Sequence, residues 1–281
     1  FGFEDFAGVD FIHYFWQVRD DLEAAGEPWV FTPAVDPFDD SEVRGAQLLA
    51  RVARIREITG ADKVNLIGHS QGGLDARYVA HMRPDLVASV TTISTPHRGS
   101  PVADLVQGAI WDDRAGQVVD AVVSLIAAPL YDADGEATSA MEALDQLSSE
   151  GTAEFNDRIT DAPGVAYYSI AGRTAYSRGG SDCRVDDSPE FISQYEGARD
   201  PVDPLLLVTE EIVDGGFWSS TPNDGLVTVE SARWGRFLGC IPADHLDQMG
   251  HLLGDLPGLL NPFRHKVFYR DLVAWLRSQG H

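Results

Sequence analysis

The stretch Lys63-Val64-Asn65-Leu66-Ile67-Gly68-His69-Ser70-Gln71-Gly72-Gly73 decides the fold that the sequence predicts. Its first five residues alternate and include β-branched side chains, which is typical of a strand, and residues 73–82 can form a helix that ends before Pro84. The pentapeptide alone also fits a structural turn with an inert serine. Its position between a strand and a helix favours a nucleophile, Ser70, raised out of the sheet, with the glycines at 68 and 72 relieving the crowding of a tight turn.

The flanking sequence alternates between strand and helix patterns. A helix is expected from Ser41, taken as its N-cap, to Gly60, with apolar residues at helical spacing. This alternation predicts one α/β domain over residues 1–281, with a doubly wound and mostly parallel sheet. An insertion at about 101–149 and a loop excursion at about 173–204 interrupt it. Further strands are expected at 29–35, 86–93 and 165–171, and a closing helix at 262–277.

The composition limits the classes of partner and compartment. With 21 Lys and Arg against 44 Asp and Glu, the net charge of −23 argues against nucleic-acid binding and fits either a calcium-binding, outward-facing protein or simply a soluble surface. No apolar run reaches the roughly 20 residues that a transmembrane helix needs. The only cysteines, Cys183 and Cys240, predict one disulfide, with two free thiols as the alternative.

A serine nucleophile needs a base and an orienting acid, which follow it in the order Asp or Glu, then His. His245 and His251 remain as candidates for the base, and the pattern favours His245. Asp224, in the turn Pro222-Asn223-Asp224-Gly225, is the favoured acid, with Asp214 and Asp203 as competitors, although Asn-Asp-Gly is also an ordinary turn sequence. The backbone N–H of Gln71, at the start of a helix, is the expected oxyanion donor.

These residues resemble the bacterial true lipases of the Pseudomonas and Burkholderia type along nearly the whole chain. The resemblance implies an α/β-hydrolase fold in which Asp224 orients the catalytic His245. It also implies a secreted serine lipase that hydrolyses acylglycerol esters at a lipid–water interface through an acyl-enzyme at Ser70. A carboxylesterase or polyester hydrolase with the same triad is the alternative, followed by a non-enzymatic homologue. The matching segments are 41–45, 47–49, 63–73, 77–80, 84–89 and 95–100.

The same resemblance implies a structural Ca²⁺ and a lid. The family holds the ion through two aspartates and main-chain carbonyls, which match Asp247, Asp203 in preference to Asp200, and the carbonyls of His251 and Asp255. The insertion at 101–149 corresponds to the family's lid, with an apolar, valine-rich helix near 118–126. A solvated acidic loop and an ordinary buried helix are the simpler alternatives.

Two features depart from the family pattern. A Cys183–Cys240 disulfide would be placed differently from the family's bridge and would brace the histidine loop. Family members also carry a strand and His-Gly-x before the segment that matches Phe1, so the second oxyanion donor is expected before residue 1, in an N-terminal segment absent from the sequence. A secretion chaperone and a monomeric state complete the expectations.

Overall fold

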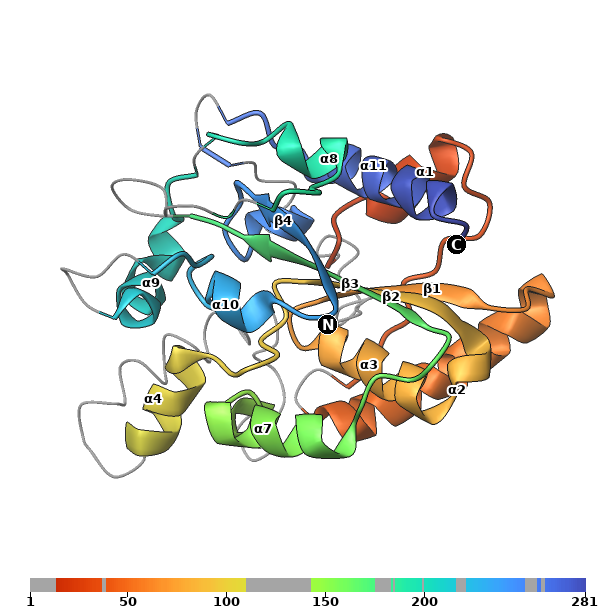
Figure 1. Cartoon of the computed structure of the whole chain (residues 1–281), viewed down its shortest axis with the longest axis horizontal. Coiled ribbons are helices and arrows are strands. Elements are labelled where there is room, and N and C mark those ends of the chain that lie inside the picture. Colours follow the sequence, from red (N-terminus) through yellow and green to blue (C-terminus); the bar gives the residue numbers. More distant parts are fainter. Residues whose placement is uncertain are drawn as a thin grey trace, which may run out of the picture.

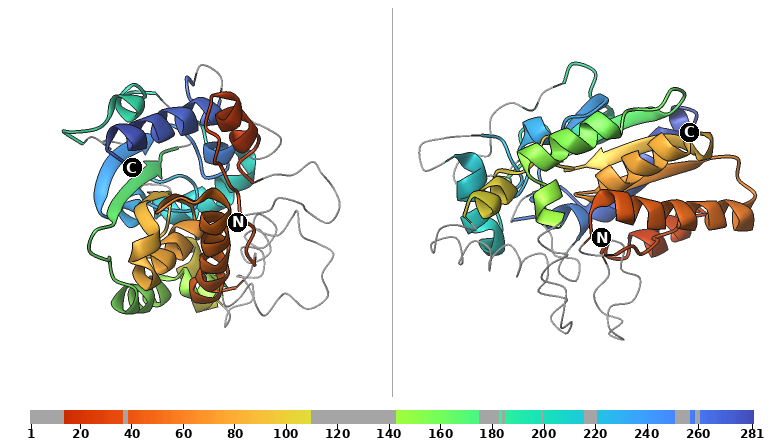
Figure 2. Two further views of the ribbon diagram at one scale, coloured as in Figure 1. Left: turned by 90° about the vertical axis from the view of Figure 1, so that its right-hand side faces the viewer. Right: turned by 90° about the horizontal axis from the view of Figure 1, so that it is seen from below.

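A parallel sheet of four strands, in the order β1-β2-β3-β4, forms the centre of the molecule. The computed structural model describes residues 14–36, 39–109, 143–174, 183, 185–198, 200–215, 221–250, 257–258 and 261–281. Helices α1, α8 and α11 cover one face of the sheet, and α2, α3 and α7 cover the other (Figures 1 and 2). The elements are α1 (Val18–Ala24), α2 (Ser41–Thr59), β1 (Val64–His69), α3 (Gly72–Met82), η1 (Pro84–Leu86), β2 (Val87–Ile93), α4 (Pro101–Ala109), α7 (Ser149–Arg158), β3 (Ala166–Gly172), α8 (Glu190–Ser193), η2 (Pro204–Leu206), α9 (Leu207–Asp214), α10 (Val229–Ala232), β4 (Arg236–Ile241), η3 (Asp247–Met249) and α11 (His265–Ser278).

The register brings the carboxyl ends of all four strands to one edge. His69 is opposite Ile93, Ile93 is opposite Ile170, and Gly172 is opposite Ile241. Loops that follow parallel strands therefore gather at this edge, which is where ligands bind in open α/β sheets. The predicted α/β fold with a mostly parallel sheet is confirmed.

Two apolar clusters fix the helices to the sheet. One joins α11 to β3 and β4, and the other joins α2 and α3 to β2. Since every strand lies between helical layers, the sheet presents a rigid frame for the loops at its carboxyl edge. Representative members of the first cluster are Phe268, Leu272, Ile170 and Leu238, and of the second Val52, Val79, Ala80 and Val90.

Helix α2 follows the predicted span but not the predicted cap. The carboxylate of Asp40 accepts hydrogen bonds from the backbone N–H groups of Glu42 and Val43, both at 2.8 Å, so Asp40 is the N-cap and Ser41 is the first helical residue. An aspartate accepts such bonds at least as well as a serine and adds a charge that favours the helix N-terminus. Gly60, with φ 69°, ends the helix as expected.

The strand predicted at 29–35 is not present: these residues have no regular secondary structure. A cavity of about 630 Å³ is lined by Val30, Phe31, Leu66 and other residues of this segment and of β1. Strands about 4.8 Å apart are joined by a ladder of backbone hydrogen bonds, and the described sheet has no such ladder between residues 29–35 and β1. Within the described residues β1 therefore pairs only with β2.

Strand β4 was not predicted because its local pattern is broken. Phe237 is opposite Ser169, but Gly239 rather than Leu238 is opposite Ile170, so a bulge interrupts the alternation of side chains. Gly239 has φ 128°, a backbone conformation that glycine tolerates. This strand leads directly into the loop that carries His245.

Only the two ends of the predicted insertion, residues 101–109 and 143–149, are described. Helix α4 packs against α9 through Val102, Val106 and Val213, all buried. The valine-rich segment near 118–126 lies outside the described residues, so the lid stays a prediction. Among the helices that are described, none is long and apolar enough to cross a membrane.

Candidate active site

Ser70 occupies the turn between β1 and α3 in a left-handed backbone conformation, with φ 54°. Its N–H donates to the carbonyl of Ile93 at 3.0 Å, and its own carbonyl accepts from Thr95 Oγ1 at 2.8 Å and from the N–H of Gly73 at 3.0 Å. A non-glycine residue persists in this region only where its surroundings impose it. The turn therefore holds a partly exposed Ser70 at the carboxyl edge of the sheet.

Around this turn, a side chain would clash with neighbouring atoms at positions 68 and 73, so these two positions require glycine. A Cβ on Gly68 would lie 2.6 Å from the carbonyl carbon of Gly72 and from the nitrogen of Gly73, and one on Gly73 would lie 2.9 Å from Thr95 Cβ. A Cβ on Gly72 would meet nothing within 4 Å. The expectation of crowding is thus confirmed for Gly68 and wrong for Gly72, since the side of α3 at residue 72 is open.

Asp224 and His245 form a buried, directed pair. His245 Nδ1 and Asp224 Oδ2 are 2.8 Å apart, and the N–H of His245 also donates to the carbonyl of Asp224 at 2.9 Å. Gln248 Nε2 donates to the same carboxylate oxygen at 2.9 Å, and the N–H of Val227 donates to the other at 2.8 Å. Asp214, one of the competing acids, instead accepts from the N–H of Thr221.

The environment of Asp224 keeps this side chain ionised although it is fully buried. Burial alone would raise its pKa, but the charge and hydrogen bond of His245, together with the Val227 N–H, lower the pKa below its usual value. An ionised Asp224 accepts from Nδ1 and leaves Nε2 of His245 as the basic nitrogen. The pair has the chemistry of a base with its orienting acid.

His69, which directly precedes Ser70, connects the nucleophile turn to this pair. The ring centroids of His69 and His245 are 4.5 Å apart, with 50° between the planes. No hydrogen bond joins Ser70 Oγ to His245 in the described part of the chain, and such contacts are commonly long until substrate binds. The ring contact nevertheless places the base beside the residue that carries the nucleophile.

The remaining described histidines near the sheet have other partners. His97 lies between Arg77 Nη1 at 3.2 Å and Thr92 Oγ1 at 3.0 Å, and burial, with the positive charge of Arg77, keeps its pKa well below the usual value. His265 contacts the carbonyl of Trp16 at 2.9 Å. His251, the alternative base, lies outside the described residues.

Gln71 stands at the N-terminus of α3 as predicted. Its side chain is buried and donates to the carbonyl of Asp39 at 2.9 Å, which fixes the residue after Ser70. The first N–H groups of a helix have no intrahelical acceptor and carry the positive end of the helix dipole. This end of α3 can therefore stabilise an oxyanion that forms next to Ser70.

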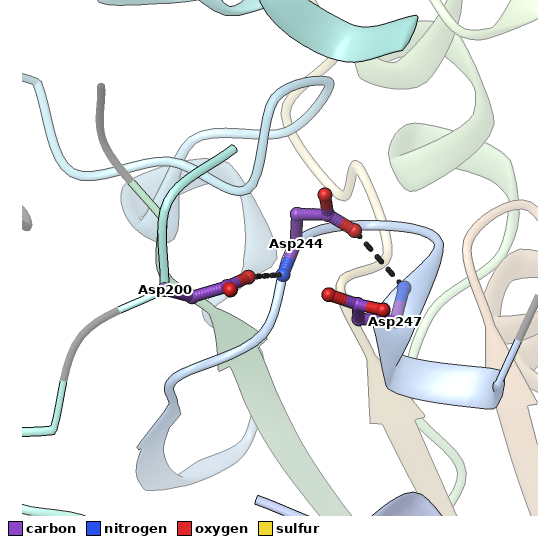
Figure 3. A group of neighbouring side chains, drawn as sticks. All are labelled: Asp200, Asp244 and Asp247. Carbon is purple, nitrogen blue, oxygen red and sulfur yellow. Dashed lines mark hydrogen bonds between the residues drawn. The ribbon is translucent and has the colours of Figure 1, made fainter. Parts of the chain in front are cut away.

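Three buried aspartates, Asp200, Asp244 and Asp247, lie together beside the histidine loop (Figure 3). One carboxylate oxygen of each is within 4.8 Å of those of the other two. Asp200 accepts from the N–H of Asp244 at 2.7 Å, and Asp244 accepts from the N–H of Asp247 at 2.9 Å. Burial and the neighbouring carboxylates raise the pKa of Asp200 to about 8 and that of Asp244 to about 7. Carboxylates gathered in this way can hold a hard cation.

The structure brings together some of the predicted calcium ligands and not others. Asp247 belongs to the aspartate group, but its neighbour there is Asp200, whereas Asp203 contacts the group through its N–H, which donates to Asp244 at 3.0 Å. His251 and Asp255 lie outside the described residues, so nothing follows about their carbonyls.

The predicted disulfide between Cys183 and Cys240 is confirmed, with a Cα–Cα distance of 5.8 Å. Cys240 lies on β4, five residues before His245, so the bridge ties the strand that precedes the histidine loop to the excursion. Ser188 adds a second tie, because its hydroxyl donates to the carbonyl of Leu238 at 2.7 Å. The expected bracing of the loop stays a prediction.

Several residues of the site were missed in the sequence. Asp244 had a readable signal, because an aspartate followed by turn residues often accepts from backbone N–H groups two and three positions later, as it does here from Leu246 and Asp247. Tyr14 and Gln248 had none, since they reach the site only through tertiary contacts.

Comparison with known proteins agrees with this geometry. The model of the alpha/beta hydrolase fold family matches residues 32–177. The chain is 36% identical over 292 residues to a triacylglycerol lipase of Vibrio cholerae, with 100% of this chain and 83% of that protein covered. It is 34% identical over 281 residues to a triacylglycerol lipase of Burkholderia plantarii, with 90% and 77% covered.

Among solved structures, a metagenomic carboxyl esterase superposes with a TM-score of 0.64 over 94% of this chain and 70% of that one. At 20% identity this likeness concerns the fold alone. Identity above 30% over most of both chains, together with the family match, carries the assignment. The chain therefore belongs to the α/β-hydrolase family and, within it, to the triacylglycerol lipases.

Proposed function

We propose that the protein hydrolyses carboxylic esters of acylglycerols through an acyl-enzyme at Ser70. The observation that carries the proposal is the strained turn that holds Ser70 at the N-terminus of α3, beside a histidine whose Nδ1 is fixed by a buried aspartate. This combination of an exposed hydroxyl, an oriented base and a helix N-terminus suits acyl transfer.

Each residue has a definite task in the proposed reaction. Ser70 attacks the ester carbonyl while Nε2 of His245 takes its proton, and Asp224 stabilises the imidazolium that forms. The N–H of Gln71 donates to the oxyanion. His245 then gives its proton to the leaving alcohol, and the same residues activate the water that releases the fatty acid.

The choice of acylglycerols rests on the relatives that carry the name triacylglycerol lipase at 34% to 36% identity. A carboxylesterase with the same triad is the second candidate, because one structural neighbour bears that name. The two differ in behaviour at an oil surface, since a lipase gains activity when the substrate exceeds its solubility. A lid formed by the insertion at 101–149 would provide that gain.

A structural Ca²⁺ fits the aspartate group. All three side chains are buried carboxylates, which are hard oxygen ligands, and their mutual repulsion is unfavourable without a cation nearby. Asp200 and Asp247 would hold the ion, and Asp200 thus replaces Asp203 as the second carboxylate. The ion would neutralise the group and hold the loop that carries His245, without contact with substrate.

Secretion is also proposed. A disulfide persists in oxidising compartments, and the Cys183–Cys240 bridge fits an exported enzyme. Thiol labelling of the protein recovered from culture medium should find both cysteines blocked. Dependence on a chaperone and a monomeric state stay predictions.

The function is tested with a fluorophosphonate ester, which labels an activated serine, followed by mapping of the adduct. Label at Ser70, loss of label in Ser70→Ala and hydrolysis of emulsified long-chain triacylglycerol would support the proposal. Label at another serine would contradict the mechanism. Activity that is confined to dissolved short-chain esters, with no rise at saturation, would favour the carboxylesterase.

A further inference from the structure

We propose that Tyr14 and His69 act together as positioning residues for His245, an inference that rests on the proposed function. Asp224 holds the imidazole of His245 at Nδ1, and a single hydrogen bond to a ring does not by itself prevent the ring from rocking about that contact. The ring of His69, 4.5 Å away between centroids, limits this motion on the side of the nucleophile turn. Catalytic side chains need such support from neighbours to hold a productive geometry.

His69 is itself held by Tyr14. The hydroxyl of Tyr14 lies 2.7 Å from Nδ1 of His69, and the two rings have centroids 5.8 Å apart. Burial raises the pKa of Tyr14 far above its usual value, so the phenol stays protonated and able to hydrogen-bond with His69. This hydrogen bond at Nδ1 of the buried His69 fixes the orientation of the ring.

The segment that carries Tyr14 is anchored to the same loop as His245. The N–H of Trp16 donates to the carbonyl of Met249 at 2.9 Å, and His265 on α11 contacts the carbonyl of Trp16 at the same distance. Phe15 and Gln17 both adopt left-handed backbone conformations, with φ 54° and 53°. Two strained residues around an anchored turn show that the surrounding packing determines where Tyr14 lies.

The main test compares Tyr14→Phe with the wild type on a soluble p-nitrophenyl ester. Loss of one hydroxyl should lower kcat about five- to tenfold and leave KM unchanged, because the substrate is bound as before but the base is less well oriented. Tyr168→Phe is the matched control, since Tyr168 makes a comparable contact to Nε2 of His281 at 3.0 Å, outside the site. This control should retain wild-type kcat.

A double-mutant cycle tests whether Tyr14 acts through His69. His69→Ala should lower kcat more than Tyr14→Phe, and the double variant should fall no further than His69→Ala alone. His69→Gln, whose amide oxygen can accept from Tyr14, should recover part of the lost kcat. Urea unfolding of each variant shows whether it is folded. If His69→Ala does not fold, the kcat values of Tyr14→Phe and His69→Gln test the positioning role.

The outcomes separate this proposal from the proposed function. Wild-type kcat in Tyr14→Phe, losses that add in the double variant, or a change in KM equal to that in kcat would each overturn the positioning role while phosphonate still labels Ser70. Absence of that label in the wild type would overturn the proposed function and the positioning role with it.

Discussion

The nucleophile turn and the histidine loop are held in place by different means. The turn at Ser70 is built from consecutive residues between β1 and α3, and its shape depends on short contacts within residues 68–95. The loop after β4 depends on partners far along the chain, which include Asp200, Asp224 and the disulfide to Cys183.

This contrast shows how rigidity is distributed around the site. The turn at Ser70 stores backbone strain that a well-packed sheet and helix support. The histidine loop instead gathers three buried carboxylates, whose mutual repulsion the proposed Ca²⁺ would relieve. We therefore expect substitutions at the turn to act through the chemistry and the packing, and changes of ion or pH to act through the loop.

The largest effect is expected at Ser70 itself. Ser70→Ala should lower kcat about 10⁶-fold, because the attacking atom is lost. Ser70→Gly should be equally inactive but should raise the free energy of unfolding by about 1 kcal/mol, since glycine tolerates φ 54°. Ester hydrolysis and urea unfolding measure the two effects. Equal stability of the Ala and Gly variants would show that the turn stores no strain.

Asp224→Asn should have the second largest effect and lower kcat by about 10⁴-fold. An amide in place of the carboxylate carries no negative charge to stabilise the imidazolium of His245. It is also a weaker acceptor for the hydrogen bond that Gln248 donates. Steady-state kinetics on a soluble ester measure the loss. Asp214→Asn is the control and should retain activity, and a larger loss there would reverse the choice of acid.

Gly68 and Gly72 lie two residues before and two residues after Ser70, but their alanine variants should differ in stability and activity. Gly68→Ala should cost about 1 to 3 kcal/mol of stability and most of the activity, because its Cβ would meet the backbone at Gly72 and Gly73. Gly72→Ala, whose Cβ would meet nothing within 4 Å, should stay within about 0.5 kcal/mol of the wild type. Thermal unfolding and kcat check the pair, and equal effects would contradict the proposed packing.

Changes of pH and Ca²⁺ should act on stability through the aspartate group. The folded-state pKa of Asp200, about 8, lies above the roughly 4 of an unfolded aspartate, so its contribution to stability is full below about pH 4 and is lost as the pH rises to about 8. In chelator, the unfolding temperature should thus fall over this range by about 10 °C, since about four pKa units correspond to about 5 kcal/mol and 1 kcal/mol to about 2 °C.

Two comparisons isolate the aspartate group as the cause. Added Ca²⁺ should remove most of the pH slope, because the ion neutralises the ionised carboxylates. Asp200→Asn should reduce the slope in chelator, whereas Asp85→Asn, at an exposed position, should not. A pH slope that is unchanged by both Ca²⁺ and Asp200→Asn would argue against the proposed site.

The parts of the molecule that depend on neighbouring residues could be predicted from the sequence. The strand at 64–69, the turn at Ser70, helices α2 and α3, and the parallel arrangement follow from side-chain periodicity and glycine placement. The choices of Asp224 and His245 followed from chain order and family resemblance, and the structure places the two in contact.

Which distant residues come into contact depends on how the elements pack, and this could not be predicted from the sequence. The tertiary structure left residues 29–35 without regular secondary structure, and it formed β4 around a bulge that hides the strand pattern. It also placed Asp200 beside Asp247, and Tyr14 on His69. Local patterns record which face of an element is buried, whereas contacts between loops depend on how the elements pack, and no short stretch of sequence encodes them.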